Sequence, residues 1–158
     1  MADIDKVLFD DHAKVKRLFA DFERGGSIDL ALTICQELTV HAELEEEVLY
    51  PVVRDQISES MADRAEDEHE LIRELVAQIE EEQPSGAELR RVVSQLKRVF
   101  ESHVTFEQEE IFTALNQRVP NELWDMGRMA FAKRQEILGG DESAMRQLTT
   151  RTIPNAGW

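Results

Sequence analysis

Two stretches of sequence decide the fold of this chain: HAELEEEVLYP, residues 41–51, and SHVTFEQEEI, residues 102–111. In each stretch a glutamate follows a histidine four residues later, as His41 and Glu45 in the first and His103 and Glu107 in the second. Apolar residues recur three and four positions apart on both sides of these pairs, which is the period of an α-helix with one buried face. Each pair is therefore expected on the inward face of a helix.

The same periodicity runs through four long segments and one shorter segment, and no run of residues favours a β-strand. The glycine pair Gly25-Gly26 and the run 83–86 (QPSG) separate long segments. A kink or break is expected near Pro51, because proline lacks the N–H group that a helix interior uses. The predicted helices cover about residues 5–24, a segment from Ser27 through Val52, about 60–82, about 87–117 and about 121–138.

Four long helices with short connections pack best as an antiparallel up-down four-helix bundle, so the fold class is all-α. The segment 121–138 adds a short additional C-terminal helix. We expect residues 1–118 to form the bundle, and residues 119–158 to form the C-terminal helix and a polar packing tail that starts at Gly139-Gly140.

Composition excludes several kinds of partner. The chain has 158 residues with 18 basic and 33 acidic side chains, and its net charge is -15. Such a surface repels nucleic-acid phosphates and anionic membranes, so neither is expected as a partner. The acidic N-terminus does not resemble a signal peptide, and no apolar run reaches the roughly 20 residues of a membrane span. Cys35 is the single cysteine, so the chain needs no oxidising compartment to form an internal disulfide. A cytoplasmic location is predicted.

One histidine falls on the apolar stripe of each long helix: His12, His41, His69 and His103. A single histidine on such a stripe is more often an ordinary core residue, and a single His-x-x-x-Glu pair is more often a surface pair. The order His, His-x-x-x-Glu occurs twice, however, and no histidine lies outside it. The inward glutamates Glu45 and Glu107 need a cationic partner when buried, and no lysine or arginine lies near them on the stripes. The combination predicts a metal site.

The number and type of ligands indicate which metal. Four imidazoles and two carboxylates are too many for one tetrahedral zinc ion, but they suit two ions that share both carboxylates. Mixed imidazole and carboxylate ligation favours iron over calcium or magnesium, and leaves manganese and zinc as alternatives.

The chain resembles the hemerythrin, or HHE cation-binding, family over about residues 5–117. The motifs that carry the resemblance are Asp11-His12, the stretch 41–51, Glu68-His69-Glu70-Leu71 and the stretch 102–111. The resemblance implies an oxo- or hydroxo-bridged non-haem di-iron site with two iron ions. In that arrangement His12 and His41 hold one iron, His69 and His103 hold the other, and Glu45 and Glu107 bridge them.

Two departures separate this chain from the oxygen-carrying members of that family. Arg73 stands where the carriers have a further histidine, and the last ligand is Glu107 rather than an aspartate at the place of Gln108. The pattern resembles the non-prototype H-HxxxE-H-HxxxE subgroup found in bacteria, actinobacteria among them. With one histidine fewer, both irons have an open position or take a water or another side chain. Tyr50 and Glu46 are candidates, although an aromatic at the bundle end is the preferred interpretation of Tyr50.

These features favour a di-iron protein that handles hydrogen peroxide or dioxygen, with catalase-like peroxide disproportionation as the leading hypothesis. The alternative is reversible binding or sensing of O2, NO or iron without turnover. Iron storage and a purely structural bundle are the less favoured hypotheses. The expected state is a monomer or a homodimer, because Leu123, Trp124 and Phe131 either cap the bundle or form a dimer interface.

Overall fold

The computed structural model describes residues 2–139. Within this range the chain is helical apart from short turns, and none of these residues lies in a strand. The all-α prediction is therefore confirmed. The elements are α1 (Ile4–Glu23), α2 (Ile28–Leu44), the π-helix η1 (Glu45–Leu49), α3 (Tyr50–Gln56), α4 (Glu59–Glu82), α5 (Gly86–Phe106), the π-helix η2 (Glu107–Ile111), α6 (Phe112–Arg118), the 3-10 helix η3 (Pro120–Glu122) and α7 (Leu123–Gly139).

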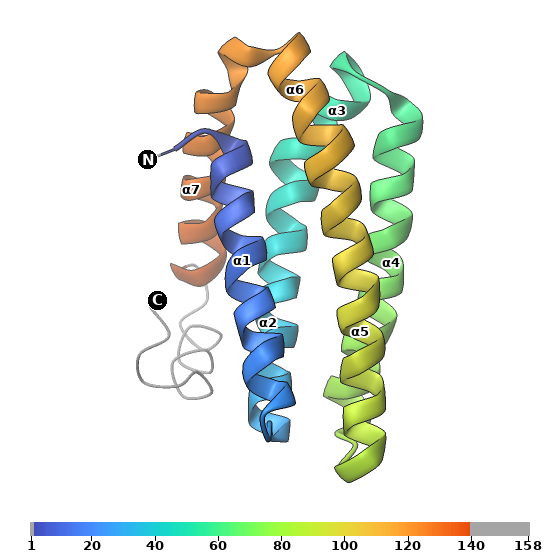
Figure 1. Ribbon diagram of the computed structural model, residues 1–158. Coiled ribbons are helices and arrows are strands. Elements are labelled where there is room, and N and C mark those ends of the chain that lie inside the picture. Colours follow the sequence, from blue (N-terminus) through green and yellow to red (C-terminus); the bar gives the residue numbers. More distant parts are fainter. Residues whose placement is uncertain (1, 140–158) are drawn as a thin grey trace.

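The long helices α1, α2, α4 and α5 lie side by side as a bundle, and α7 runs beside α1 (Figure 1). The helices α2, η1 and α3 follow one another without a break and form one continuous helical segment. The helices α5, η2 and α6 form a second continuous segment in the same way. The bundle is thus made of two helical hairpins. The N-terminal hairpin is α1 with α2-η1-α3, and the C-terminal hairpin is α4 with α5-η2-α6.

The ends of the long helices follow from local sequence. After α1 the backbone turns at Gly25, whose φ of 119° is accessible to glycine and strained for other residues. Helix α4 begins after Ser58, whose hydroxyl oxygen accepts a hydrogen bond of 3.2 Å from the backbone N–H of Met61. These signals place the boundaries of α1 and α4 within one residue of the predicted ones.

Two π-helices interrupt the regular helices, and the sequence prediction anticipated only one irregularity, near Pro51. In η1 the backbone N–H of Tyr50 donates to the carbonyl of Glu45, and in η2 the N–H of Phe112 donates to the carbonyl of Glu107. Pro51 has no N–H to donate, which favours the loss of regular bonding around η1. No proline is present in η2. What the two π-helices share is a buried glutamate as their first residue.

The core consists of two apolar clusters. The first contains parts of α1, α2, α4 and α5, with Phe19, Leu38, Ile79 and Phe100 among its residues. The second lies toward α3, α6 and α7 and includes Leu8 and Leu115. Along each long helix the predicted metal residues fall between segments that belong to different clusters, so a polar layer separates the two halves of the core.

Helix α7 packs against α1 and α2 through Leu123, Met126 and Ala130, which are buried. At Gly127 a Cβ atom would lie 1.9 Å from the carbonyl oxygen of Ala2, so glycine permits the start of the chain to cross α7 closely. Trp124 and Phe131 are half exposed, whereas Leu123 belongs to the core. The tail predicted after Gly139 lies outside the described residues.

Candidate metal centre

The structure brings together all six residues that the sequence analysis singled out. They lie in the polar layer between the two apolar clusters, and the most exposed of them, His41, is only 5% exposed. The helices α1, α2, α4 and α5 each contribute one histidine, and each π-helix contributes its first residue, a glutamate. The residues are His12, His41, Glu45, His69, His103 and Glu107.

These side chains form two groups that share both glutamates. In each group the possible ligand atoms all lie within 4.8 Å of one another. We name the two groups by their histidines. Position 1 contains His12 and His41, and position 2 contains His69 and His103.

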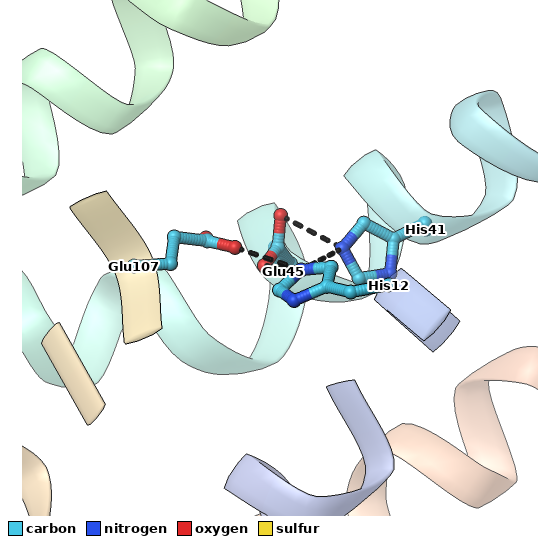
Figure 2. A group of neighbouring side chains, drawn as sticks. All are labelled: His12, His41, Glu45 and Glu107. Atoms are coloured by element: carbon cyan, nitrogen blue, oxygen red, sulfur yellow. Dashed lines mark hydrogen bonds and ion pairs between the residues drawn. The ribbon is translucent and has the colours of Figure 1, made fainter. Parts of the chain in front are cut away.

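Position 1 is built from α1 and α2. The Nε2 atoms of His12 and His41 lie 3.1 Å apart. Glu107 approaches from the other hairpin, with Oε1 at 3.1 Å from Nε2 of His12, and Glu45 places Oε1 at 3.3 Å from Nε2 of His41. Figure 2 shows the two carboxylates directed toward the two imidazole rings. The four side chains therefore converge on one small volume.

Position 2 is built from α4 and α5 in the same way. The Nε2 atoms of His69 and His103 lie 3.2 Å apart. Oε1 of Glu45 lies 2.9 Å from Nε2 of His69, and Oε2 of Glu107 lies 3.3 Å from Nε2 of His103. Each glutamate thus reaches both positions, as a bridging carboxylate must.

Tyr50 also lies in the centre, rather than at the end of the bundle where the sequence analysis placed it. Its side chain is 1% exposed, and its hydroxyl donates to Oε2 of Glu107 at 2.7 Å or to Oε1 of Glu45 at 3.2 Å. The same oxygen lies 3.0 Å from Nε2 of His69 and 3.3 Å from Nε2 of His103. The π-turn of η1 connects Glu45 to Tyr50 and so directs both side chains toward position 2.

The outward-facing nitrogen of every histidine meets a hydrogen-bond acceptor. Each Nδ1 atom lies between 2.7 and 3.1 Å from a carboxylate or amide oxygen. The pairs are His12 with Gln108, His41 with Asp11, His69 with Glu46 and His103 with Glu68. An acceptor at Nδ1 requires that Nδ1 carries the proton, so a neutral ring presents a bare Nε2 lone pair to the interior.

The interior therefore collects lone pairs and negative charge. Within the described part of the chain, Oε2 of Glu45 and Oε1 of Glu107 have no hydrogen-bond partner, although both atoms are buried. Such groups are costly unless a proton or a metal ion lies between them. A metal ion fits the donor set, because imidazole and carboxylate ligands with outward N–H groups held by acceptors are the usual surroundings of a protein-bound transition metal.

Without a metal, protons take that place. Burial alone would lower the pKa of His41, but the charge of Glu45 and the hydrogen bond to Asp11 outweigh burial and raise it to about 10. Burial likewise opposes the charged form of Glu45, yet the neighbouring His41 holds the pKa of that carboxyl well below its usual range. Burial, and then the charges of Glu107 and Glu45, raise the pKa of Tyr50 well above its ordinary value. The same attractive field that binds these protons is available to a cation.

Each outer carboxylate is held in turn by an arginine. Arg73 pairs with Glu46, and Arg64 lies 3.3 Å from Glu68. From α7, Arg134 pairs with Asp11. Arg73 stands where the oxygen carriers have a further histidine, and in this structure it lies outside the centre. Its guanidinium pairs with Glu46, which in turn holds the ring of His69.

Sequence reasoning predicted the six inner residues and missed most of the outer ones. The sequence analysis quoted Asp11 and Glu68 within motifs but did not predict that they accept hydrogen bonds from His41 and His103. Each stands immediately before a histidine in the chain, which is a signal that sequence reasoning can use. Arg134 carried no such signal, because its contact with Asp11 depends on how α7 packs. None of the described helices is long and apolar enough to span a membrane.

Comparisons with known proteins agree with this geometry. The model of the hemerythrin HHE cation-binding domain matches residues 3–115. A DNA nickase from Nostoc sp. (strain PCC 7120) is 32% identical over 145 residues, which cover 87% of this chain. The chain spans only 41% of that relative's length. No solved structure was found to match. The extent of the family match shows that this chain belongs to the hemerythrin HHE cation-binding family.

Proposed function

We propose that the protein holds two iron ions and disproportionates hydrogen peroxide. The convergence of four Nε2 atoms and two carboxylates in one buried layer, in two groups whose possible ligand atoms lie within 4.8 Å of one another, is the observation that carries the proposal. Position 1 would be held by His12 and His41, position 2 by His69 and His103, and Glu45 and Glu107 would bridge them. The centre would lie in an antiparallel up-down four-helix bundle of residues 1–118, with residues 119–158 as an addition.

Iron is favoured because the ligands are nitrogen and carboxylate oxygen, and because two ions that share carboxylates suit two-electron chemistry on a small molecule. When bound, the iron pair supplies Lewis acidity and the exchange of electrons with peroxide. The chain supplies the rest of the site. Its helices fix the ligands in a buried layer between two apolar clusters, which keeps the six inner side chains away from bulk solvent.

Tyr50 and Glu107 provide a route for a proton inside this closed layer. The phenol hydroxyl lies 2.7 Å from Oε2 of Glu107, and its raised pKa keeps the proton on the phenol oxygen at neutral pH. Disproportionation of two peroxides to two waters and one O2 needs protons to pass between the reacting oxygens but consumes none. A neutral Tyr50 hydroxyl that donates to this carboxyl oxygen can hold or return a proton without the entry of bulk water.

Oxygen evolution in an electrode chamber tests the proposal. Iron-loaded protein with a measured content of two irons is mixed with hydrogen peroxide, and the metal-free protein serves as control. One O2 for every two peroxides, dependent on bound iron, is expected. No evolution from fully loaded protein would contradict the enzyme proposal and favour the alternative, in which the same centre binds O2, NO or iron without turnover.

The name of the Nostoc relative raises DNA cleavage as another activity. In this chain the net charge of -15 opposes binding to DNA phosphates, and more than half of the relative lies outside the match. The absence of nucleic-acid partners therefore remains a prediction. Incubating the same iron-loaded and metal-free samples with supercoiled plasmid tests it, and iron-dependent nicked circles would contradict it.

A further inference from the structure

The two metal positions are related by an approximate repeat of the two hairpins, and the repeat is broken just outside the ligands. The residue that follows each bridging glutamate reaches the histidine of the other hairpin. Glu46 lies 2.7 Å from Nδ1 of His69, and Gln108 lies 3.0 Å from Nδ1 of His12. One histidine is therefore held by a carboxylate, and its counterpart is held by a neutral amide.

The second break falls at the end of each π-turn. Tyr50 and Phe112 occupy the same place, five residues after their glutamates, and each places its ring beside the histidine of the other hairpin. The ring centroids lie 5.1 Å apart for Tyr50 and His69 and 6.1 Å apart for Phe112 and His12. Only Tyr50 carries an oxygen that reaches into the centre. Position 2 thus has one possible oxygen donor more than position 1.

The remaining outer contacts do not distinguish the positions. Asp11 holds His41 at 3.1 Å, and Glu68 holds His103 at 2.7 Å, so each position has at least one histidine held by a carboxylate. An arginine pairs with each of the outer carboxylates as well. Both breaks in the repeat therefore act in the same direction, and both favour position 2.

We propose that the two positions are unequal: position 2 binds its ion first and more tightly, and position 1 carries a weaker, exchangeable ion. The inference rests on the proposed metal centre. A carboxylate that accepts from Nδ1–H increases the basicity of the imidazole, and the loss of such an outer partner typically changes metal affinity by about tenfold to a hundredfold. Gln108 gives His12 less of this support than Glu46 gives His69.

Anaerobic calorimetric titration of the metal-free protein with Fe2+ tests the inequality. The wild type should show two binding steps at least about tenfold apart in affinity. Glu46→Gln should weaken the tighter step, and Gln108→Glu should strengthen the weaker step, each by about tenfold or more. The matched controls are Glu47→Gln, which removes an exposed charge next to Glu46, and Gln117→Glu, which adds an exposed charge to α6.

Each result bears on a different claim. Two indistinguishable steps in the wild type, or a weaker step that Gln108→Glu leaves unchanged, would overturn the inequality while the metal centre stands. A weaker step that falls in Glu46→Gln would overturn the assignment of the tight position to His69 and His103. No uptake of Fe2+ would overturn both the inference and the metal centre. Two unequal steps in a protein that evolves no O2 would support the inference and contradict only the enzyme proposal.

Discussion

The N-terminal and C-terminal hairpins use the same spacing to build the centre and differ in how they surround it. Both contribute a histidine, a His-x-x-x-Glu pair and a π-turn. Helix α7 packs mainly beside the N-terminal hairpin, against α1, α2 and η1, and its Arg134 pairs with Asp11. The arginines around the other position, Arg64 and Arg73, are themselves more exposed.

If the two positions are unequal as proposed, ligand strength and protection from solvent are divided between the hairpins. Position 2 has the stronger set of donors, with Tyr50 and two outer carboxylates. Position 1 has fewer donors, but an additional helix covers it, and its outer carboxylate Asp11 is the least exposed of the three. On the same proposal, the position that binds its ion more weakly is the one better shielded from solvent, which suits a centre that must exclude other reactants.

The largest effect is expected from a change that removes what the two positions share. Glu45→Ala should lower the metal content from two ions to less than one, because both positions lose a ligand. The stabilisation by metal, about 2.7 kcal/mol for each site at a free metal concentration a hundred times Kd, should disappear with it. Metal analysis after gel filtration and thermal unfolding with and without Fe2+ measure both effects. Glu43→Ala, an exposed change on the same helix, is the control and should behave as the wild type.

Changes confined to one position should separate the two. His103→Ala should remove the tight ion and leave only the weaker one, whereas His41→Ala should remove the weaker ion and leave about one tight ion for each chain. After identical washing, His41→Ala is expected to retain several times more iron than His103→Ala. Iron content by atomic absorption, normalised to protein, measures the ratio. Equal retention would mean that the positions have the same affinity.

Most of the fold and the grouping of the six inner residues could be predicted from the sequence, because both depend on periodicity. His12, His41, His69 and His103 coincide with helical stripes that the apolar residues define independently. The role of Tyr50 could not be predicted in this way. In a regular helix a residue five positions after Glu45 points away from it, and only the π-turn of η1 brings Tyr50 back to the same side.

The outer contacts depend on distances between helices, which periodicity does not determine. Glu46 belongs to an acidic run of three that resembles a solvated face, and Gln108 belongs to a similar run in η2. Their contacts with His69 and His12 cross from one hairpin to the other. The arrangement of the hairpins therefore decides which member of each run reaches a histidine.

A smaller effect is expected from giving position 1 the donor that it lacks. Phe112→Tyr places a hydroxyl at the counterpart of Tyr50 and should strengthen the weaker Fe2+ step by about tenfold, which corresponds to about 1.4 kcal/mol. It should also slow any reaction of NO with the ion at position 1, because the new donor competes for that ion. Calorimetry and stopped-flow absorption measure the two effects. Phe106→Tyr, a buried aromatic outside the ligand layer, is the control. An unchanged weaker step would show that this side chain does not reach position 1.

The smallest effect is expected from α7, which acts on position 1 only through Asp11. Arg134→Met keeps much of the aliphatic length of the side chain but removes the charge that pairs with Asp11. The loss of a partly exposed ion pair should lower the free energy of unfolding by no more than about 1 kcal/mol. Asp11 then accepts only from His41, so His41 becomes a slightly better donor and the weaker Fe2+ step should tighten by a few fold. Arg128→Met, which removes an exposed pair with Asp125 on the same helix, should leave that step unchanged. If Arg134→Met instead abolished the weaker step, α7 would be part of the architecture of position 1 rather than a cover over it.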